Sequence, residues 1–152
     1  MGRFLIGTAA VLLLAGCQAN SRYENLDAAP QYQSGAEIRD ALDRAGLGCA
    51  DFRAISQAQR EIGEKDALEV GTCRVDDVAA TIIVWLRLGD AQDWARSHRS
   101  TGCRLAKSVG TPEPVHVDGG RWTIALNSRA VADKIAETLG GQAKFADCTS
   151  VD

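Results

Sequence analysis

Long apolar runs, histidine and an excess of positive charge are all scarce in this sequence of 152 residues. The one long apolar run covers residues 4–14, which excludes a protein that crosses a membrane several times. Histidine occurs twice and methionine once, so there is little material for a metal site built from histidine. The 17 basic residues against 20 acidic ones give a net charge of −3, which argues against a general nucleic-acid binder.

Motifs of common enzymes and cofactor sites are also missing. The chain has no Cys-x-x-Cys pair, no Gly-x-Ser-x-Gly elbow, no Walker loop, no Gly-x-Gly-x-x-Gly and no EF-hand loop. Asp76 and Asp77 are adjacent in a predicted turn and point apart, whereas a retaining glycosidase needs two carboxyls about 5 Å apart. We therefore predict no catalytic residue, no cofactor and no metal.

The N-terminus carries the clearest signal in the sequence. One positive charge at Arg3 precedes the apolar run, which is too short to span a bilayer and is typical of a secretory signal peptide. The following residues, Leu14-Ala15-Gly16-Cys17, resemble the lipobox of bacterial lipoproteins. The resemblance implies cleavage before Cys17 and attachment of lipid to the Cys17 thiol. The alternatives are an ordinary signal peptide with a chance cysteine and a buried N-terminal helix.

This resemblance divides the chain into three parts. We expect a signal peptide over residues 1–16, a lipidated Cys17 followed by a flexible tether over residues 17–33, and a single domain over residues 34–152. The protein would be secreted and held by its lipid on the outer face of the cell membrane, or in the outer membrane. The tether is polar and contains Pro30. We expect its Tyr23 and Tyr32 to be solvated, and the alternative is that they stack on the domain or bind a partner.

Four further cysteines remain for the domain: Cys49, Cys73, Cys103 and Cys148. An even number of cysteines in an exported domain predicts two disulfides, and four cysteines allow three pairings. We favour Cys49–Cys73 and Cys103–Cys148, because each bridge then stays within one half of the chain. A metal site or a redox pair is the alternative, and the long spacings between these cysteines disfavour both.

The pattern of the domain predicts an α+β fold with an antiparallel sheet of about five strands and helices packed on one face. The residue balance, 45% apolar and 24% charged, is that of a globular domain. The predicted elements follow the order α-β-β-β-α-β-β-α. They are a helix over 35–46, strands near 50–55, 68–73 and 79–88, a helix from Asp90 to about Gly102, strands near 115–118 and 122–126, and a last helix that is capped by Asn127 or Ser128 and runs to Leu139.

The strand over 81–86 is apolar on both faces and is predicted to lie at the centre of the sheet. The succession strand, strand, helix occurs twice, which suggests a duplicated ββα unit. The second unit, from Gly119 to Gly141, also resembles the C-terminal part of small, uncharacterised actinobacterial lipoproteins, a resemblance that implies no particular activity.

Binding residues are predicted from charge and aromatic content. Four cations and a histidine fall within twelve residues: Arg96, His98, Arg99, Arg104 and Lys107. This cluster could bind a polyanion or an acidic partner, or it could be a solvated helix face with cations near the helix C-terminus. We select Arg96, Arg99, Arg104 and Trp122 as candidate ligand-binding residues. We expect His116 to be a surface histidine on a strand and His98 to be partly buried or solvated.

The leading functional hypothesis is a non-enzymatic binding module at the cell envelope. It would recognise a protein or an envelope ligand such as a polyanion, would bind no nucleic acid, and would reach the membrane through the lipid on Cys17. One alternative is an inhibitor or immunity-type lipoprotein. Another is a small secreted hydrolase that uses His98 or His116, which requires a concave pocket around that histidine.

Overall fold

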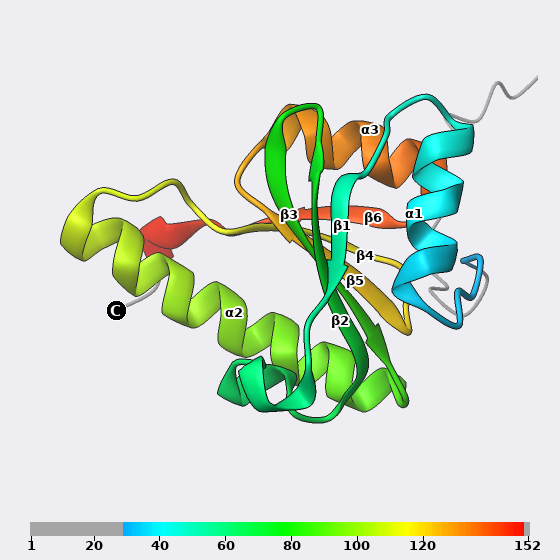
Figure 1. Ribbon diagram of the computed structural model, residues 1–152. Coiled ribbons are helices and arrows are strands. Elements are labelled where there is room, and N and C mark those ends of the chain that lie inside the picture. The colour runs from blue at the N-terminus through cyan, green and yellow to red at the C-terminus, as the bar shows by residue number, and fades with distance from the viewer. Residues whose placement is uncertain (1–28, 151–152) are drawn as a thin grey trace, which may run out of the picture.

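The computed structural model describes residues 29–150 (Figure 1). The predicted signal peptide, Cys17 and most of the predicted tether lie outside these residues. The fold is α+β, as predicted, with six strands in place of about five. The helices and strands are α1 (Gly35–Arg44), β1 (Ala50–Ala54), β2 (Ala67–Val75), β3 (Val78–Trp85), α2 (Leu88–Val109), β4 (Val115–Asp118), β5 (Trp122–Leu126), α3 (Arg129–Leu139) and β6 (Gln142–Phe145), with short 3-10 turns at Gln57–Gln59, Ile62–Glu64 and Cys148–Ser150.

The strands form one open sheet in the order β1-β2-β3-β5-β4-β6, in which every neighbouring pair is antiparallel. Both predicted hairpins, β2–β3 and β4–β5, are present. They join through β3 and β5, with Ile82 opposite Ile124. The sixth strand, β6, was not predicted. It pairs with β4 at the edge of the sheet and places Lys144 opposite His116.

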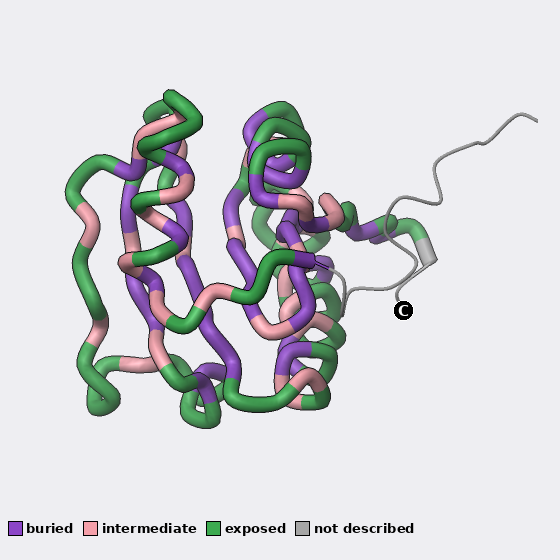
Figure 2. The backbone as a smooth tube through the Cα atoms, turned by 90° about the vertical axis from the view of Figure 1, so that its right-hand side faces the viewer, coloured by how far each residue is buried: buried purple, intermediate pink, exposed green. Residues whose placement is uncertain are grey.

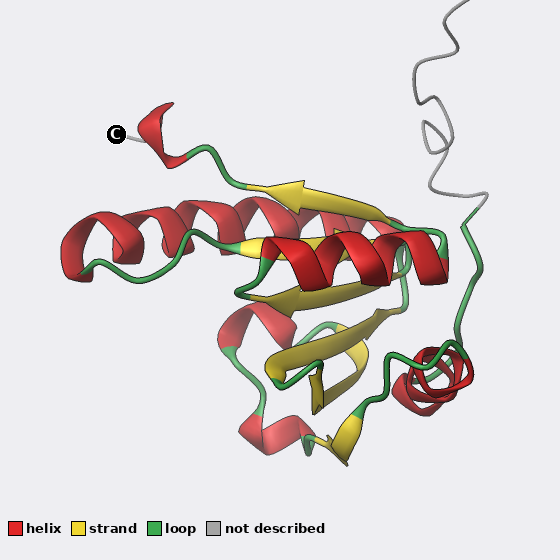
Figure 3. Ribbon diagram, turned by 90° about the horizontal axis from the view of Figure 1, so that it is seen from above, coloured by secondary structure: helices red, strands yellow, loops and turns green. Residues whose placement is uncertain are grey.

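Helices cover both faces of this sheet, and the prediction that they share one face is wrong. Ile82 and Val84 of β3 belong to the apolar cluster of α1 and α3, whereas Ile83 and Trp85 belong to the cluster of α2. Viewed from above, the sheet lies between α3 and α2 (Figure 3). The reason is the strand pattern itself, because a central strand that is apolar on both sides requires a cover on each.

The second hypothesis about the order, a duplicated ββα unit, is also not supported. A duplicated unit would relate the two hairpins by a two-fold rotation. Because β3 is antiparallel to β5, the axis of that rotation is perpendicular to the sheet, and the rotation does not exchange the two faces. A duplicated unit would therefore have α2 and α3 on the same face. They lie on opposite faces, so the recurrence is one of element order only.

The larger apolar core lies between the sheet and the pair α1 and α3. Its fully buried side chains include Ile38 and Leu42 of α1 and Ile135 of α3. In Figure 2 the buried parts of the chain follow the strands and the inward sides of the helices, and the connecting loops are exposed. Ser34 is the N-cap of helix α1, as predicted, and its hydroxyl accepts a hydrogen bond from the Glu37 amide at 3.2 Å.

Helix α2 is longer than predicted at both ends. It begins at Leu88 with Arg87 at the N-cap, and Asp90, the predicted N-cap, lies in its first turn and pairs with Arg87. The predicted stop at Gly102 is wrong, because the helix continues to Val109 and ends at Gly110. A Cβ at position 102 would lie 2.6 Å from Cγ of Pro114, so this glycine permits close packing and does not end the helix.

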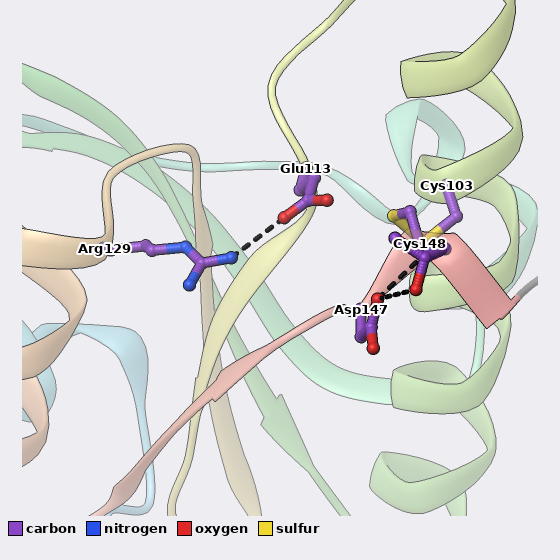
Figure 4. Close-up of a disulfide and its surroundings, with 6 residues drawn as sticks. Cys103, Glu113, Arg129, Asp147 and Cys148 are labelled. Carbon is purple, nitrogen blue, oxygen red and sulfur yellow. Dashed lines mark hydrogen bonds and ion pairs between the residues drawn. A yellow bond between two sulfur atoms is a disulfide. The ribbon is translucent and has the colours of Figure 1, made fainter.

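The two favoured disulfides, Cys49–Cys73 and Cys103–Cys148, are both present. The second joins the middle of α2 to the segment after β6 (Figure 4). Cys103 and Cys148 are buried together with Ala146 in a small cluster of their own. Within residues 29–150, no helix has the length and apolar character needed to cross a membrane.

The last residues of the predicted tether pack on the domain. The indole N–H of Trp122 donates to the carbonyl of Pro30 at 2.8 Å, and the ring of Tyr32 meets the Trp122 ring edge-on at 5.8 Å. Ala29 is buried. The expectation of a solvated Tyr32 is therefore wrong, and ordered packing starts at least five residues before the predicted domain boundary.

Candidate functional site

A cleft of about 370 Å³ lies between α2 and the edge of the sheet formed by β4 and β6. Its volume is within the range of pockets that bind small molecules, which is about 300–1,000 Å³. The residues that line it come from α2, from β4 and from the segments around β6: Gln92, Ala95, Arg96, Arg99, Pro114, His116, Asp118, Lys144, Phe145 and Ala146. Most of the polar groups among them carry nitrogen donors.

The floor of the cleft is polar because of strand alternation. Val115 and Val117 of β4 point to the larger core, so His116 and Asp118 point to the α2 face. Residues directly opposite in an antiparallel pair share a face, and Lys144 is opposite His116. Three polar side chains therefore meet under α2, where the sheet is no longer apolar.

The wall of the cleft is one stripe of α2. Gln92, Ala95, Arg96 and Arg99 follow the spacing i, i+3, i+4, i+7, which places them on one side of a helix. The neighbouring stripe contains Trp94, which packs toward the sheet against Trp85. Helix α2 thus presents an apolar stripe to β3 and a cationic stripe to the cleft.

Both histidines belong to this region. His98 stacks on Trp94 with the ring centroids 4.5 Å apart, and His116 meets His98 edge-on at 6.0 Å. His116 is only 7% exposed. Nε2 of His98 is buried and has no hydrogen-bond partner among the described residues.

The pKa values of this cluster follow from burial. Burial, helped by the charges of His98, Lys144 and Arg99, lowers the pKa of His116 to about 4. Burial also lowers the pKa of His98, against the attraction of Glu61. Both imidazoles are therefore neutral at pH 7.

Positive charge dominates the cleft. Arg96 pairs with Asp93 one turn earlier on α2, and both side chains are well exposed. Lys144 donates to the neutral amide oxygen of Gln142. Arg99 has no ion-pair partner within residues 29–150.

Asp118 supplies the one carboxyl among the residues that line this cleft. It accepts a bond from the Gly120 amide at 3.1 Å, and burial raises its pKa. One carboxyl faces three cationic side chains in the cleft, Arg96, Arg99 and Lys144, so positive groups outnumber acidic ones.

A second, smaller cleft of about 250 Å³ lies on the other side of α2. Asp66, Asp90 and Asp93 line it, together with Trp94 and the 86% exposed Ile62. Two of its carboxylates are already paired, Asp90 with Arg87 and Asp93 with Arg96. Helix α2 therefore separates a cationic cleft from an acidic one that is partly neutralised.

The predicted binding residues divide into two groups. Arg96 and Arg99 line the cationic cleft, whereas Arg104 lies further along α2, is exposed and does not line it. Trp122 is fully buried on the opposite face of the sheet under Pro30, so it offers no surface to a ligand. Cys17 lies outside the described residues, and the other four cysteines form the two disulfides.

The structure contradicts the sequence predictions about the positions of Arg96, Arg99 and His116. Arg96 and Arg99 are not near a helix C-terminus, because α2 continues for ten residues beyond Arg99, so the helix dipole does not explain their position. His116 is not a surface histidine. The alternation of β4 correctly predicted that His116 points to the side of the sheet opposite to Val115 and Val117. Helix α2 covers that side, so His116 is buried.

Gln92, Asp118 and Lys144 line the cleft and were not selected from the sequence. A signal existed for Asp118, because His116 and Asp118 are two residues apart on one strand and must share a face. Lys144 could not be placed, because nothing in the sequence predicted β6 or its pairing with β4.

Within residues 29–150, no three side chains of histidine, cysteine, aspartate or glutamate are arranged to hold a metal ion. Comparisons of the chain with family profiles, with curated proteins and with solved structures found no match.

Proposed function

We propose that this protein is a non-enzymatic ligand-binding module of the cell envelope, whose ligand site is the cationic cleft between α2 and β4–β6. The observation that carries this proposal is the convergence in one cleft of Arg96 and Arg99 from α2 with His116 and Lys144 from the sheet. A concave site with a few converging polar groups is the usual form of a small-molecule site.

The absence of a nucleophile in the cleft wall supports a binding function. None of the described residues that line the cleft is a serine, threonine or cysteine. His116 is flanked by cations and is neutral at pH 7. Within residues 29–150, neither histidine makes a hydrogen bond to a carboxylate that would orient it as a base. The groups present are suited to holding a ligand in place.

The lipid anchor is a separate part of the proposal. The disulfides are consistent with an extracytoplasmic protein. Cys17 would carry the lipid, and the chain would reach the domain at Ala29, beside Trp122. This entry point is on the α1 and α3 face of the sheet, so an anchor there would leave the cleft on the α2 face open to ligand.

The binding function can be tested by blocking the cleft. Gln92 is exposed on α2 and lines the cleft, so Gln92→Trp fills it without disturbing a buried position. Ser100→Trp puts the same side chain on an exposed position of α2 outside the cleft and is the matched control. The thermal stability of the protein as isolated is measured against a panel of anionic, neutral and cationic small molecules.

We expect at least one compound to raise the unfolding temperature of the wild type and of Ser100→Trp, but not of Gln92→Trp. A ligand at a hundred times its Kd stabilises by about 2.7 kcal/mol, a shift that is easily measured. If no compound stabilises the protein, or if Gln92→Trp responds as the wild type does, the cleft is not the ligand site. Turnover of a compound in the panel would contradict a non-enzymatic function.

A hydrolase is the second candidate, and one observation favours it: His116 lies in a concave site, two residues from Asp118. The test is activity toward p-nitrophenyl phosphate and p-nitrophenyl acetate, for the wild type and for His116→Gln. We expect neither protein to exceed the uncatalysed rate. Activity that is lost in His116→Gln would favour the hydrolase over the binding module.

A further inference from the structure

We infer that the cleft binds a small, soluble oxyanion compound, with a phosphate or carboxylate group held between Arg99 and Lys144. This inference rests on the proposed function, since it names the ligand class of the same site. Four observations support it: the cations that line the cleft, the groups that pair with these cations, the volume of the cleft and the face of the sheet on which it lies.

The cations of the cleft come from two separate elements. Arg96 and Arg99 are on the α2 wall, and Lys144 is on β6, the edge strand of the sheet. A group bound between them would be contacted from both sides. The guanidinium presents a planar fork of donors that matches two oxygens of a phosphate or carboxylate, and the ammonium adds a point charge.

These cations are available to a ligand. Arg99 has no ion pair within residues 29–150, and Lys144 donates to an uncharged amide. Arg96 is paired with Asp93, but the two side chains are 69% and 72% exposed, and an exposed pair is weak enough to exchange. Asp118 is the one carboxyl lining the cleft, and its hydrogen bond goes to the protein backbone.

The size and the remaining polar groups limit the ligand to a small molecule. The volume of about 370 Å³ has room for a compound of sugar size and not for a folded partner. Gln92 and the neutral imidazole of His116 are uncharged groups that can donate to or accept from hydroxyls. The expected ligand therefore combines one anionic group with hydroxyl or other polar groups.

The cleft lies on the face of the sheet opposite to the first described residues. Ala29 and Pro30 pack beside Trp122 on the α1 and α3 face, whereas the cleft is on the α2 face. The N-terminal segment therefore leaves the cleft open to a soluble compound. The vesicle measurement below distinguishes such a compound from a lipid headgroup.

The test is a calorimetric titration of the isolated protein with inorganic phosphate at pH 7 and low salt. We expect saturable binding of phosphate, weaker binding of acetate and none of glucose or choline. Arg99→Glu should weaken phosphate binding at least tenfold, and Lys144→Gln should weaken it several-fold. Arg104→Glu makes the same change of charge on the same helix outside the cleft, and it should weaken binding less than twofold.

Several outcomes would overturn the inference. Equal losses in Arg99→Glu and Arg104→Glu would show attraction to net charge and not a site. Binding to phosphatidylglycerol vesicles that Arg99→Glu abolishes, without binding of free phosphate, would make the ligand a lipid. If glucose or choline stabilises the protein and Gln92→Trp abolishes that effect while phosphate does not bind, the inference fails and the proposed function stands. If no compound binds, both fail.

Discussion

The two faces of the sheet are built from the same strands but differ in what they contain. The α1 and α3 face is apolar along its whole length, from Val75 to Leu126, and its largest side chains are fully buried. The α2 face is apolar only beneath the first half of the helix, around Trp85 and Trp94. Beyond that point it carries histidines, Asp118 and Lys144, and it opens into the cleft.

The two faces of the sheet thus differ in role: one stabilises the fold and the other contains the candidate ligand site. The apolar face supplies most of the free energy of folding, because buried apolar area is the main stabilising contribution. The α2 face buries less apolar area, because polar side chains take the place of apolar ones where the cleft lies. A disulfide at Cys103 ties the far half of α2 to the C-terminal segment, where apolar contacts are few.

The largest predicted effect is on the apolar face. Ile135→Ala removes a fully buried side chain from α3, and we expect it to lower the free energy of unfolding by about 2–5 kcal/mol. Leu105→Ala on α2 removes a side chain that is 50% exposed, and it should cost less than about 1 kcal/mol. Chemical denaturation of both variants measures the difference, and similar losses would contradict the comparison of the faces.

The next effect concerns the disulfide of the α2 face. Replacing Cys103 and Cys148 together by alanine opens a loop closed over a sequence separation of 45 residues. Chain entropy predicts a loss of about 2–4 kcal/mol in the free energy of unfolding. Denaturation of the double variant tests this value. A change below about 1 kcal/mol would mean that other contacts hold the end of α2.

The pH dependence of stability should arise on the α2 face. The pKa of His116 is lowered from 6.5 in the unfolded chain to about 4 in the fold. Between these two values the unfolded state binds the proton more strongly, so the free energy of unfolding falls as the pH falls from 6.5 to 4. The loss should approach about 3 kcal/mol. The lowered pKa of His98 adds a loss of the same sign.

Asp118 acts in the opposite direction, since its pKa is raised and protonation at low pH stabilises the fold. The measurement is the urea midpoint of the wild type and of His116→Gln at pH 7, 6, 5 and 4. We expect the decline toward acid to be clearly shallower in His116→Gln. Equal slopes in the two proteins would show that His116 is not buried as described.

A smaller effect is expected where the apolar and polar parts of the α2 face meet. The indole N–H of Trp85 donates to the hydroxyl of Thr123 at 3.0 Å in a buried position. Thr123→Val leaves that donor unsatisfied and should cost about 1–3 kcal/mol. Thr81→Val, on the adjacent strand, is the control and should change stability by less than about 0.5 kcal/mol.

Among the variants discussed, Arg99→Glu should have the smallest effect on stability and the largest effect on ligand binding. Arg99 is exposed and has no ion pair among the described residues, so Arg99→Glu should change the free energy of unfolding by less than about 0.5 kcal/mol. The same variant should lose phosphate binding. A large loss of stability in Arg99→Glu would mean that its side chain is part of the packing of α2.

Local patterns in the sequence predicted much of the fold. Alternation and turn residues predicted the central strand, both hairpins and the cap at Ser34, and they limited the cap of α3 to Asn127 or Ser128. The disulfide pairing found is the one favoured among three, in which each bridge stays within one half of the chain. Strand β6 was missed because Gln142–Phe145 is short and has no apolar alternation. Its existence depends on pairing with β4, which is a long-range contact.

The candidate site was predicted less well, for a related reason. Alternation assigned His116 to the face opposite Val115 and Val117, but it did not tell what covers that face. Gly102 was interpreted as a stop, although it allows α2 to pass close to Pro114. With α2 ending early, Arg99 lay near a helix terminus and the cleft could not be anticipated.

The most direct test of the cleft as an anion site uses the two histidines as probes. The sequence contains no other histidine, so the imidazole NMR spectrum consists of His98 and His116 alone. A bound anion favours the protonated imidazole. We expect saturating phosphate to raise the pKa of His116 from its value of about 4 in the wild type, and not in Arg99→Glu. A titration of His116 that phosphate leaves unchanged in the wild type would contradict an anion site in the cleft.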